Sequence, residues 1–416
     1  MASAEAGTRS ASSSSDGKRR RAKPILLNRL EGCSGTVNAA MAIPHEDAVI
    51  SVSEDATIRV WLKRDSGDYW PSICHACPCP ASSMDYDGTS KRLFAGLETG
   101  TVVEFLLADD LNRMTLKRSY SAHMARVTDV SVSLDMNYLL TAGRDKYFQW
   151  HCTDTGRRLG GFKSDAWCTA VQFDPVTRYV FVADYAGQIN VLKLEEQNLS
   201  HVTTLKGHSG SIRSLAWDPD NRLLFSGSFD ESIIVWDIGS QKGTALELHG
   251  HVEKVRGLDF VPHAKKLFSS GDDAMLIVWD MTADRKETPE WTESDTCQRC
   301  GSAFFWNFRE MWATKQLAVN RQHHCRRCGK AMCDPCTMKT SPIPPLGFEM
   351  PVRVCNDCFK DMDDSEKVSK AQFFEMKHRV SYLQVDLSKR RLITSGFDNT
   401  IKIWDIKSLL DPVPSN

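Results

Sequence analysis

The chain has 416 residues and a formal net charge of −1, with 41% hydrophobic and 25% charged residues. This length allows two or three domains and a sizeable core, and the composition is that of an ordinary soluble protein. The near-neutral charge argues against a general nucleic-acid binder. No apolar run is long enough to span a bilayer, so we expect any membrane contact to be peripheral.

Residues 1–23 are predicted to form a disordered basic tail. They are rich in Ser, Ala and Gly and then become basic between Lys18 and Lys23. Such a composition cannot bury a core. A solvated tail is the favoured interpretation of the basic run. A nuclear import signal and an auxiliary patch for anionic lipid are the alternatives.

From residue 24 onward the chain repeats itself at intervals of 41–46 residues. The clearest unit runs from Gly207-His208 to Trp236-Asp237, and the next from Gly250-His251 to Trp279-Asp280. Each unit holds three short apolar, β-branched runs separated by turn residues, and a fourth short run precedes each Gly-His. This pattern indicates β-strands. Further copies end near Trp61, Phe105, His151, Leu192 and Trp404.

This period, with its Gly-His and Trp-Asp signatures, resembles the WD-repeat family, whose units are the blades of a β-propeller. Seven copies imply a mainly β fold with seven blades. We assign blades one to six to residues 24–283. Residues 24–31 are expected to complete blade seven, which lacks its own outer strand, and to close the ring, because closure removes long exposed sheet edges. An open repeat array is the alternative.

The copies differ at one position of the repeat. Four of them carry an Asp six residues before the terminal Trp: Asp55, Asp230, Asp273 and Asp398. In the WD-repeat family this Asp joins a hydrogen-bond network with the repeat's His, so His208 and His251 are interpreted as structural. Asp145 lies one residue out of register, and Thr99 and Ala186 replace the Asp. We therefore expect blades two and four to be held by packing alone.

An insertion interrupts the repeats between Trp279 and Trp404. These two residues are 125 positions apart, which is one repeat of 43 residues plus 82 more. We place the inserted domain at residues 284–363, after the third strand of blade six. Residues 364–410 then supply the outer strand of blade six and blade seven.

The inserted domain contains four Cys-x-x-Cys pairs, which are Cys297 and Cys300, Cys325 and Cys328, Cys333 and Cys336, and Cys355 and Cys358. Two thiolates three positions apart can share one tetrahedral zinc, so four pairs supply two closed, structural sites. Disulfides are the alternative. They are disfavoured because the chain shows no secretory signal and disulfides rarely persist in a reducing cytosol. We therefore expect two Zn²⁺ ions. The spacing does not decide which pairs share an ion.

Basic residues surround these cysteines. The segment from Arg321 to Arg327 reads RQHHCRR, no acid occurs between 321 and 330, and Arg353 precedes Cys355 by two positions. A cationic cluster that is fixed by metal can bind a phosphorylated ligand through charge-assisted hydrogen bonds. A solvated basic face is the alternative for any single residue.

At these residues the domain resembles the FYVE zinc-finger family, which has four CxxC pairs, a Trp-Asp motif before them, R(R/K)HHCR and RVC. The resemblance implies one zinc on Cys297, Cys300, Cys333 and Cys336, and another on Cys325, Cys328, Cys355 and Cys358. It also implies binding of phosphatidylinositol 3-phosphate on early endosomes. The implied lipid-binding residues are Arg321, His323, His324, Arg326, Arg353 and Asp295.

Two residues depart from the family pattern, and one segment is longer. Gln322 removes a charge, and Asp295 stands four residues after Trp291 instead of three. Leu317 and Val319 match the apolar loop that enters the bilayer in the family. The long aromatic segment 304–312 can also insert, but a short core for the finger is the favoured interpretation.

The architecture as a whole resembles the WD-repeat and FYVE domain-containing family. This implies a non-enzymatic adaptor or scaffold that is cytosolic and peripheral on early endosomes. Its finger would recruit it to the membrane. Its propeller would hold protein partners in vesicle traffic and signalling, kinases and their substrates among them. The alternative is a RING-like zinc ubiquitin ligase that uses the propeller for substrates. A nucleic-acid reader is disfavoured by the charge.

Overall fold

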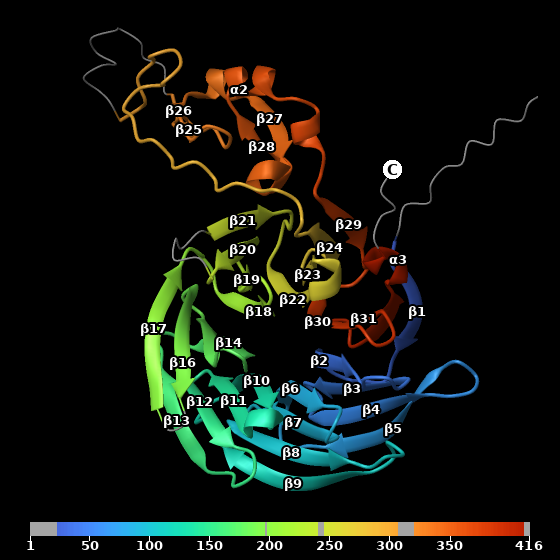
Figure 1. The fold of residues 1–416 in the computed structure, drawn as a ribbon. Coiled ribbons are helices and arrows are strands. Elements are labelled where there is room, and N and C mark those ends of the chain that lie inside the picture. Colours follow the sequence, from blue (N-terminus) through green and yellow to red (C-terminus); the bar gives the residue numbers. More distant parts are fainter. Residues whose placement is uncertain (1–22, 196–197, 240–244, 307–319, 412–416) are drawn as a thin grey trace, which may run out of the picture.

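The repeated units form seven four-stranded antiparallel blades arranged in a ring (Figure 1). The structure, a computed structural model, describes residues 23–195, 198–239, 245–306 and 320–411. Its strands in blades one to four are β2 (Val37–Ala42), β3 (Ala48–Ser53), β4 (Thr57–Lys63) and β5 (Tyr69–Ala76); β6 (Ala81–Asp87), β7 (Arg92–Leu97), β8 (Thr101–Leu107) and β9 (Met114–Ser121); β10 (Val127–Ser133), β11 (Tyr138–Gly143), β12 (Tyr147–Cys152) and β13 (Arg158–Lys163); and β14 (Cys168–Asp174), β15 (Tyr179–Asp184), β16 (Gln188–Glu195) and β17 (Asn198–Lys206).

Of the remaining three blades, only blade six is interrupted by the finger. Blade five has β18 (Ile212–Asp218), β19 (Leu223–Ser228), β20 (Ser232–Asp237) and β21 (Ala245–His249); blade six has β22 (Val255–Val261), β23 (Lys266–Gly271), β24 (Met275–Asp280) and β29 (Ala371–Glu375); blade seven has β30 (Val380–Asp386), β31 (Arg391–Gly396), β32 (Ile401–Asp405) and β1 (Ile25–Leu30), followed by α3 (Lys407–Leu410). The finger lies between β24 and β29. The predicted fold class, a propeller with a finger inserted between strands of blade six, is therefore confirmed.

Strand β1 closes the ring by pairing with β32. The two strands are antiparallel, with Leu26 opposite Trp404 and Leu30 opposite Ile401. The N-terminal strand therefore completes blade seven, as the sequence predicts. This pairing excludes the open repeat array.

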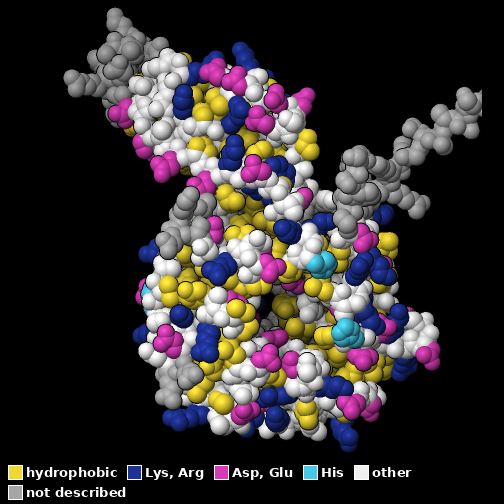
Figure 2. All heavy atoms as spheres, viewed as in Figure 1, with side chains coloured by type: hydrophobic (Ala, Val, Ile, Leu, Met, Phe, Trp, Pro, Cys, Tyr) yellow, Lys and Arg dark blue, Asp and Glu magenta, His cyan; other side chains and the backbone are white. Residues whose placement is uncertain are grey.

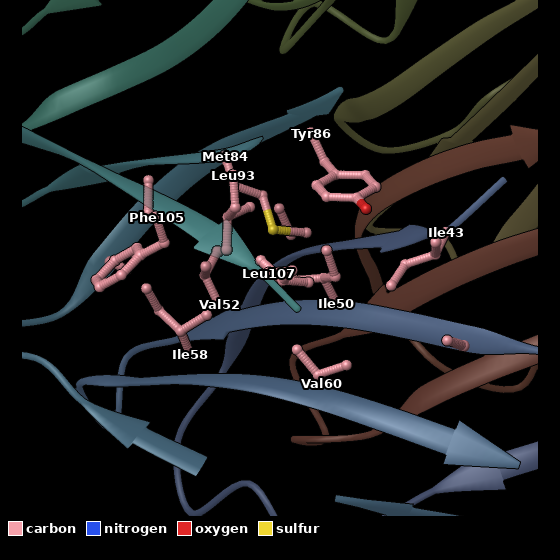
Figure 3. Close-up of a cluster of buried hydrophobic side chains, with 14 of the residues drawn as sticks. Ile43, Ile50, Val52, Ile58, Val60, Met84, Tyr86, Leu93, Phe105 and Leu107 are labelled. Atoms are coloured by element: carbon pink, nitrogen blue, oxygen red, sulfur yellow. The ribbon is translucent and has the colours of Figure 1, made fainter. Parts of the chain in front are cut away.

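The core lies between neighbouring blades, where the faces of adjacent sheets meet. Figure 3 shows one such cluster, in which Ile50 and Val60 of blade one face Met84 and Leu93 of blade two. All six residues of β3 are buried, because this strand has a neighbour on each edge and a blade on each face. Such strands have a nearly continuous apolar sequence. The repeat tryptophans Trp61, Trp236, Trp279 and Trp404 are buried in these interfaces, as expected.

A polar network closes the turn of each complete repeat. In blade five, His208 Nδ1 lies 2.9 Å from Asp230 Oδ2 and its Nε2 lies 2.8 Å from Ser226 Oγ. The Trp236 indole N–H donates to the same Ser226 oxygen at 2.8 Å. Burial alone would raise the pKa of Asp230, but the hydrogen bonds from His208 and Ser232 lower this pKa well below its usual value. The role of His208 is therefore structural.

The same network is present in blades three, six and seven. Its His and Asp residues are His123 and Asp145, His251 and Asp273, and His378 and Asp398. The expectation that Asp145 lies one residue out of register is wrong. His151 takes the place of the repeat Trp, opposite Leu139 as Trp236 is opposite Leu224, and Asp145 stands six residues before it and contacts His123 at 2.9 Å.

The expectation that blades two and four are held by packing alone is wrong. In blade four the buried Asp184 accepts hydrogen bonds from Ser164 Oγ at 3.0 Å and from the backbone N–H of Ala186 at 2.9 Å. In blade two, the buried Glu104 carboxylate binds Arg92 Nε at 2.7 Å and the Tyr120 hydroxyl at 2.6 Å. Ser164 and Asp184 thus form a polar contact at the turn of blade four, whereas Glu104 of blade two joins three neighbouring strands of its sheet, since buried polar atoms need partners.

Three aspartates join neighbouring blades around the central channel. Asp85 accepts a backbone N–H bond from Val132 of the next blade, and Asp129 and Asp259 do the same with Val171 and Val385, at 2.7–2.9 Å. Burial raises the pKa of each of the three carboxyls to about 6. A raised carboxyl pKa favours the folded state at low pH. This contribution is lost as pH rises through the folded-state value.

We therefore expect Asp259→Asn to destabilise the protein more at pH 5 than at pH 8. Asn keeps an acceptor for Val385 but does not titrate, so only the wild type loses the contribution of this side chain to stability between pH 5 and pH 8. The difference in free energy of unfolding between the two proteins should shrink by about 1 kcal/mol from pH 5 to pH 8. Urea unfolding of both proteins at both pH values measures this, and an unchanged difference would contradict it.

Candidate metal centres and basic pocket

The finger brings its eight cysteines together in two groups of four. Cys297, Cys300, Cys333 and Cys336 form one group, and Cys325, Cys328, Cys355 and Cys358 form the other, with the four sulfur atoms of each group within 4.8 Å of one another. None of the eight forms a disulfide. Sulfur atoms bound to one tetrahedral zinc are about 3.8 Å apart, given a Zn–S distance of about 2.3 Å. The Cys300 and Cys333 sulfurs are 3.6 Å apart. Each group therefore fits a closed, structural zinc site.

Tight turns shape the first two cysteine pairs. The N–H of Gly301 donates to the Cys297 carbonyl, and the N–H of Gly329 donates to the Cys325 carbonyl, both at 2.8 Å. Gly329 has a φ of 71°, and a Cβ there would lie 2.2 Å from the Glu290 carbonyl oxygen. A glycine is required at this position, because the segment that leads into the finger passes directly over it.

The regular structure of the finger is small. It consists of the hairpin β25 (His323–His324) and β26 (Ala331–Met332), the hairpin β27 (Lys339–Ile343) and β28 (Phe348–Val354), and the helix α2 (Asn356–Asp361). Its core contains Phe304 together with five buried cysteines, of which Cys325 and Cys355 are examples. Five of the twelve buried core residues are metal ligands, so we expect the finger to depend on the metal for its stability.

Two of the predicted lipid-binding residues meet at one acid. Arg353 Nη1 donates a hydrogen bond to Asp334 Oδ1 at 2.9 Å, and His323 Nε2 lies 2.8 Å from the same oxygen. The contact of His323 is close enough for an ion pair. Burial alone would raise the pKa of the Asp334 carboxyl, but the hydrogen bond from Arg353 and the contact with His323 lower this pKa below its usual value. The Arg353 guanidinium and the His323 ring thus converge on a single oxygen position.

Two others meet at Trp291. The His324 ring stacks on the Trp291 ring with a centroid distance of 4.8 Å and an angle of 9°. The Arg326 guanidinium lies 4.4 Å from the centre of the same ring. His324 Nε2 is also 3.2 Å from the Thr292 carbonyl oxygen. The Trp-containing segment ahead of the first cysteine pair therefore holds the basic motif in place.

The remaining residues predicted to bind lipid or membrane make few contacts with this basic pocket or lie outside the described residues. Arg321 is exposed and has no ion pair with any described residue. Asp295 accepts a hydrogen bond from the Trp306 indole N–H at 3.2 Å, and nothing in the described part of the chain links it to the basic residues. Leu317 and Val319 lie outside the described residues.

Sequence reasoning missed Asp334, the acid on which His323 and Arg353 converge. It is the first residue after Cys333, inside the third cysteine pair, and is the acid closest in the sequence to the basic motif on its C-terminal side. That position was the only available signal, because the contact with Arg353 spans 19 residues.

The aromatic segment is described in part. Phe304 is buried in the finger core, whereas Phe305 and Trp306 are exposed.

The finger is also joined to the propeller through blade five. Strand β28 pairs in parallel with β21, where Phe348 lies opposite His249, so that β28 and β27 extend the sheet of blade five to six strands (Figure 1). The His249 N–H donates to the Gly347 carbonyl at 2.8 Å, and the rings of His249 and Phe348 stack at 4.8 Å. The finger is therefore fixed by its chain connections to blade six and by backbone pairing with blade five.

A buried ion pair completes this junction. The Arg285 guanidinium and the Glu349 carboxylate, both buried, lie 3.9 Å apart. Glu349 also accepts hydrogen bonds from Ser369 Oγ at 2.7 Å and from the Lys370 N–H at 3.1 Å. Residues that enter the finger, leave it and lie within it thus share one polar cluster. Figure 2 shows the finger as a separate lobe joined to one side of the ring.

Comparison with known proteins agrees with both domains. Residues 289–364 match the FYVE zinc finger model, and five stretches match the WD domain, G-beta repeat model: 25–61, 114–149, 199–237, 242–280 and 372–405. The human WD repeat and FYVE domain-containing protein 2 is 54% identical over 384 residues, which cover 92% of this chain and 96% of that protein. The chain belongs to the WD repeat and FYVE domain-containing protein family.

Other relatives align with the chain over a similar share of its length. The human WD repeat and FYVE domain-containing protein 1 is 52% identical, with 92% of this chain and 93% of that protein covered. The Caenorhabditis elegans protein 2 of the family is 38% identical, with 93% and 94% covered. Among solved structures, the WD40 β-propeller domain of Doa1 has a TM-score of 0.61 at 16% identity, covers 92% of this chain and 96% of that chain, and supports the fold alone.

Membership in this family agrees with the structural observations. The WD model leaves residues 62–113 and 150–198 unmatched, and these stretches contain Glu104 of blade two and Asp184 of blade four. The FYVE finger binds two zinc ions through its two four-cysteine groups. A FYVE finger also implies association with endosomal membranes. Within the described residues, every helix is too short and polar to cross a bilayer.

We expect two zinc ions per chain and the loss of at least one in Cys333→Ser. Removal of one thiolate opens a closed four-sulfur site and removes part of the finger core. Cys74→Ser, which changes an exposed cysteine outside both groups, is the matched control and should keep two ions. Mass spectrometry of the purified proteins gives the metal content, and two ions in Cys333→Ser would contradict the assignment.

Proposed function

We propose that this protein is a phosphatidylinositol 3-phosphate-binding adaptor on early endosomes. Residues 284–363 recruit the chain to the membrane. Residues 24–283 and 364–410 form the propeller that holds protein partners in vesicle traffic and signalling, kinases and their substrates among them. The observation that carries the proposal is the convergence of His323 and Arg353 on one oxygen position at Asp334.

In this proposal the head-group phosphate binds at that position. A phosphate monoester carries between one and two negative charges near neutral pH and offers three acceptor oxygens, so it outcompetes a single carboxylate for Arg353 and His323. His323 Nε2 would then contact a phosphate oxygen in place of the Asp334 carboxylate. The head-group contacts are assigned to Arg321, His323, His324, Arg326 and Arg353, with Asp295 nearby.

Apolar side chains support the membrane contact. We propose that Leu317 and Val319 enter the bilayer, where burial of two such side chains contributes roughly 2–5 kcal/mol. The exposed Phe305 and Trp306 are of the type that favours the membrane interface. The hydrophobic contribution therefore compensates for the charge that Gln322 removes from the basic motif.

The ubiquitin-ligase alternative is weaker. All eight candidate zinc ligands are cysteines, whereas RING ligand sets usually include a His, and a ligase does not need a converging pair of cations such as His323 and Arg353. We therefore propose a binding function without enzymatic activity. Autoubiquitination with a panel of conjugating enzymes would support the alternative.

We expect the double variant Arg326→Ala and Arg353→Ala to lose at least 90% of its binding to vesicles that contain phosphatidylinositol 3-phosphate. Both guanidiniums belong to the basic pocket, and truncation removes their charge and their hydrogen bonds. The measurement is liposome flotation against vesicles without the lipid. Binding that survives the double substitution would contradict the proposed site.

The matched control replaces two exposed arginines of the propeller, Arg113 and Arg157, with Ala. This control has the same net charge as the double variant, so a loss confined to the double variant cannot arise from charge alone. Zinc content is measured in both proteins, because Arg326 follows the zinc ligand Cys325 directly.

We expect Asp334→Asn to bind the same vesicles several-fold more tightly than the wild type. The substitution removes the negative charge that occupies the converging position of His323 and Arg353, while the Asn oxygen can still accept from Arg353. Flotation over a series of lipid concentrations measures the change. Weaker or unchanged binding, with two zinc ions retained, would show that the carboxylate does not compete with the lipid.

A further inference from the structure

A cavity of about 340 Å³ lies in the mouth of the central channel of the propeller, away from the finger. Four arginines line it, Arg126, Arg144, Arg213 and Arg256, whereas Glu54 is the single acid in its wall. The basic motif of the finger takes no part in this cavity, and the proposed lipid binding does not use it. Four cations facing one carboxylate indicate a site for an anion.

Two of these arginines already have acidic partners. Arg126 Nη2 donates to Glu54 Oε1 at 2.8 Å. Arg256 binds Asp272 through Nε and Nη2 at 2.8 and 2.9 Å. These two guanidiniums therefore stabilise the wall of the cavity and contribute little free hydrogen-bonding capacity.

The other two arginines retain free donors. Arg213 donates from Nη1 to the Thr169 carbonyl oxygen at 3.2 Å, which leaves most of its guanidinium donors available. Arg144 is exposed, and its guanidinium lies 5.8 Å over the Trp167 ring; in the described part of the chain it has no carboxylate partner. An arginine with unused donors can bind a phosphate group in a two-pronged manner.

Among the described residues, two polar groups in the wall of the cavity lack a full set of favourable partners. Burial lowers the pKa of Arg213. The nearby Asp129 opposes this effect, and the repulsion of Arg256, Arg126 and Arg144 adds to it. The side chain of Thr169, only 9% exposed and in the same wall, has an Oγ1 atom with no hydrogen-bond partner among the described residues. A bound anion would satisfy both groups.

Aromatic side chains at the rim indicate a ligand larger than an inorganic ion. Trp167 and Tyr185 are 45% and 57% exposed, with ring centroids 5.5 Å apart, and Phe397 is 37% exposed. All three line the cavity. Exposed aromatic and arginine side chains are typical of the central part of protein interfaces. We propose that this mouth of the channel binds a phosphorylated serine or threonine side chain of a partner polypeptide.

The position of the cavity allows the finger to act at the same time. Arg144, Tyr185 and Phe397 lie in turns between the second and third strands of their blades, whereas the finger begins after the third strand of blade six, at the opposite end of the sheets. A polypeptide at the cavity therefore does not compete with the membrane. This inference rests on the proposed function in one respect, because that function gives the propeller a protein partner.

The test compares retention of degenerate peptide libraries on the immobilised full-length chain. The libraries have a central phosphoserine, serine or glutamate and are otherwise identical. We expect at least ten-fold greater retention of the phosphoserine library than of the serine library, with the glutamate library in between. Equal retention of the phosphoserine and serine libraries would overturn the proposal.

Two variants locate the binding. Arg144→Glu and Thr169→Val should each reduce retention of the phosphoserine library at least five-fold, since one reverses a free charge and the other removes the unpartnered hydroxyl. Arg64→Glu is the matched control, because Arg64 also lies over an exposed tryptophan, Trp70, but outside the cavity. Full retention by both cavity variants would overturn the assignment.

Two further measurements separate the remaining explanations. The first uses pyrophosphate as a probe. If it raises the melting temperature of the wild type but not of Arg144→Glu, and the phosphoserine library is not enriched, the cavity is a small-anion site and the proposal is overturned. Flotation on vesicles with phosphatidylinositol 3-phosphate should be unchanged in Arg144→Glu and Thr169→Val. Lipid binding that is absent in the wild type would contradict the proposed membrane function alone.

Discussion

The antiparallel pairing of β1 with β32 is the contact on which the rest of the structure depends. Blade six is interrupted between its third and fourth strands, so its outer strand β29 returns only after 90 residues of intervening chain. Closing such a long loop costs entropy that the pairing of one strand has to offset. A ring that is already closed between the two chain ends holds β24 in place for β29, and this makes the insertion tolerable.

Within the closed ring, polar groups distinguish blades that are otherwise built on one plan. The His–Asp network ties a turn to the third strand within a blade, as His208, Ser226 and Trp236 do in blade five. The channel aspartates tie one blade to the next, as Asp259 does through the Val385 N–H. The first kind of contact can be replaced, as Asp184 shows, because a buried acid at the turn with donors around it is equally satisfied. The second kind positions neighbouring blades around the channel.

Much of this architecture follows from local patterns in the sequence. The spacing of the Gly-His and Trp-Asp signatures gives the number of blades, residues 25–30 give the closure, and Cys-x-x-Cys pairs give two zinc ions. Contacts between residues that belong to no common sequence motif could not be predicted. The pairing of His249 with Phe348 joins two strands of different domains, and Arg144 and Arg213 meet only because the ring brings blades three and five around one channel. The substitute networks were missed because a buried acid has no fixed spacing from its donors.

The pairing of β28 with β21 also determines which strand edges of the propeller are open. The outer edge of β21 would otherwise present unpaired N–H and C=O groups, and in this chain the finger covers it at His249. Open strand edges are templates for pairing with other chains. Because five of the twelve buried residues of the finger core are metal ligands, loss of zinc is expected to loosen β28 and to uncover this edge. The metal would then also limit pairing of the propeller with other chains.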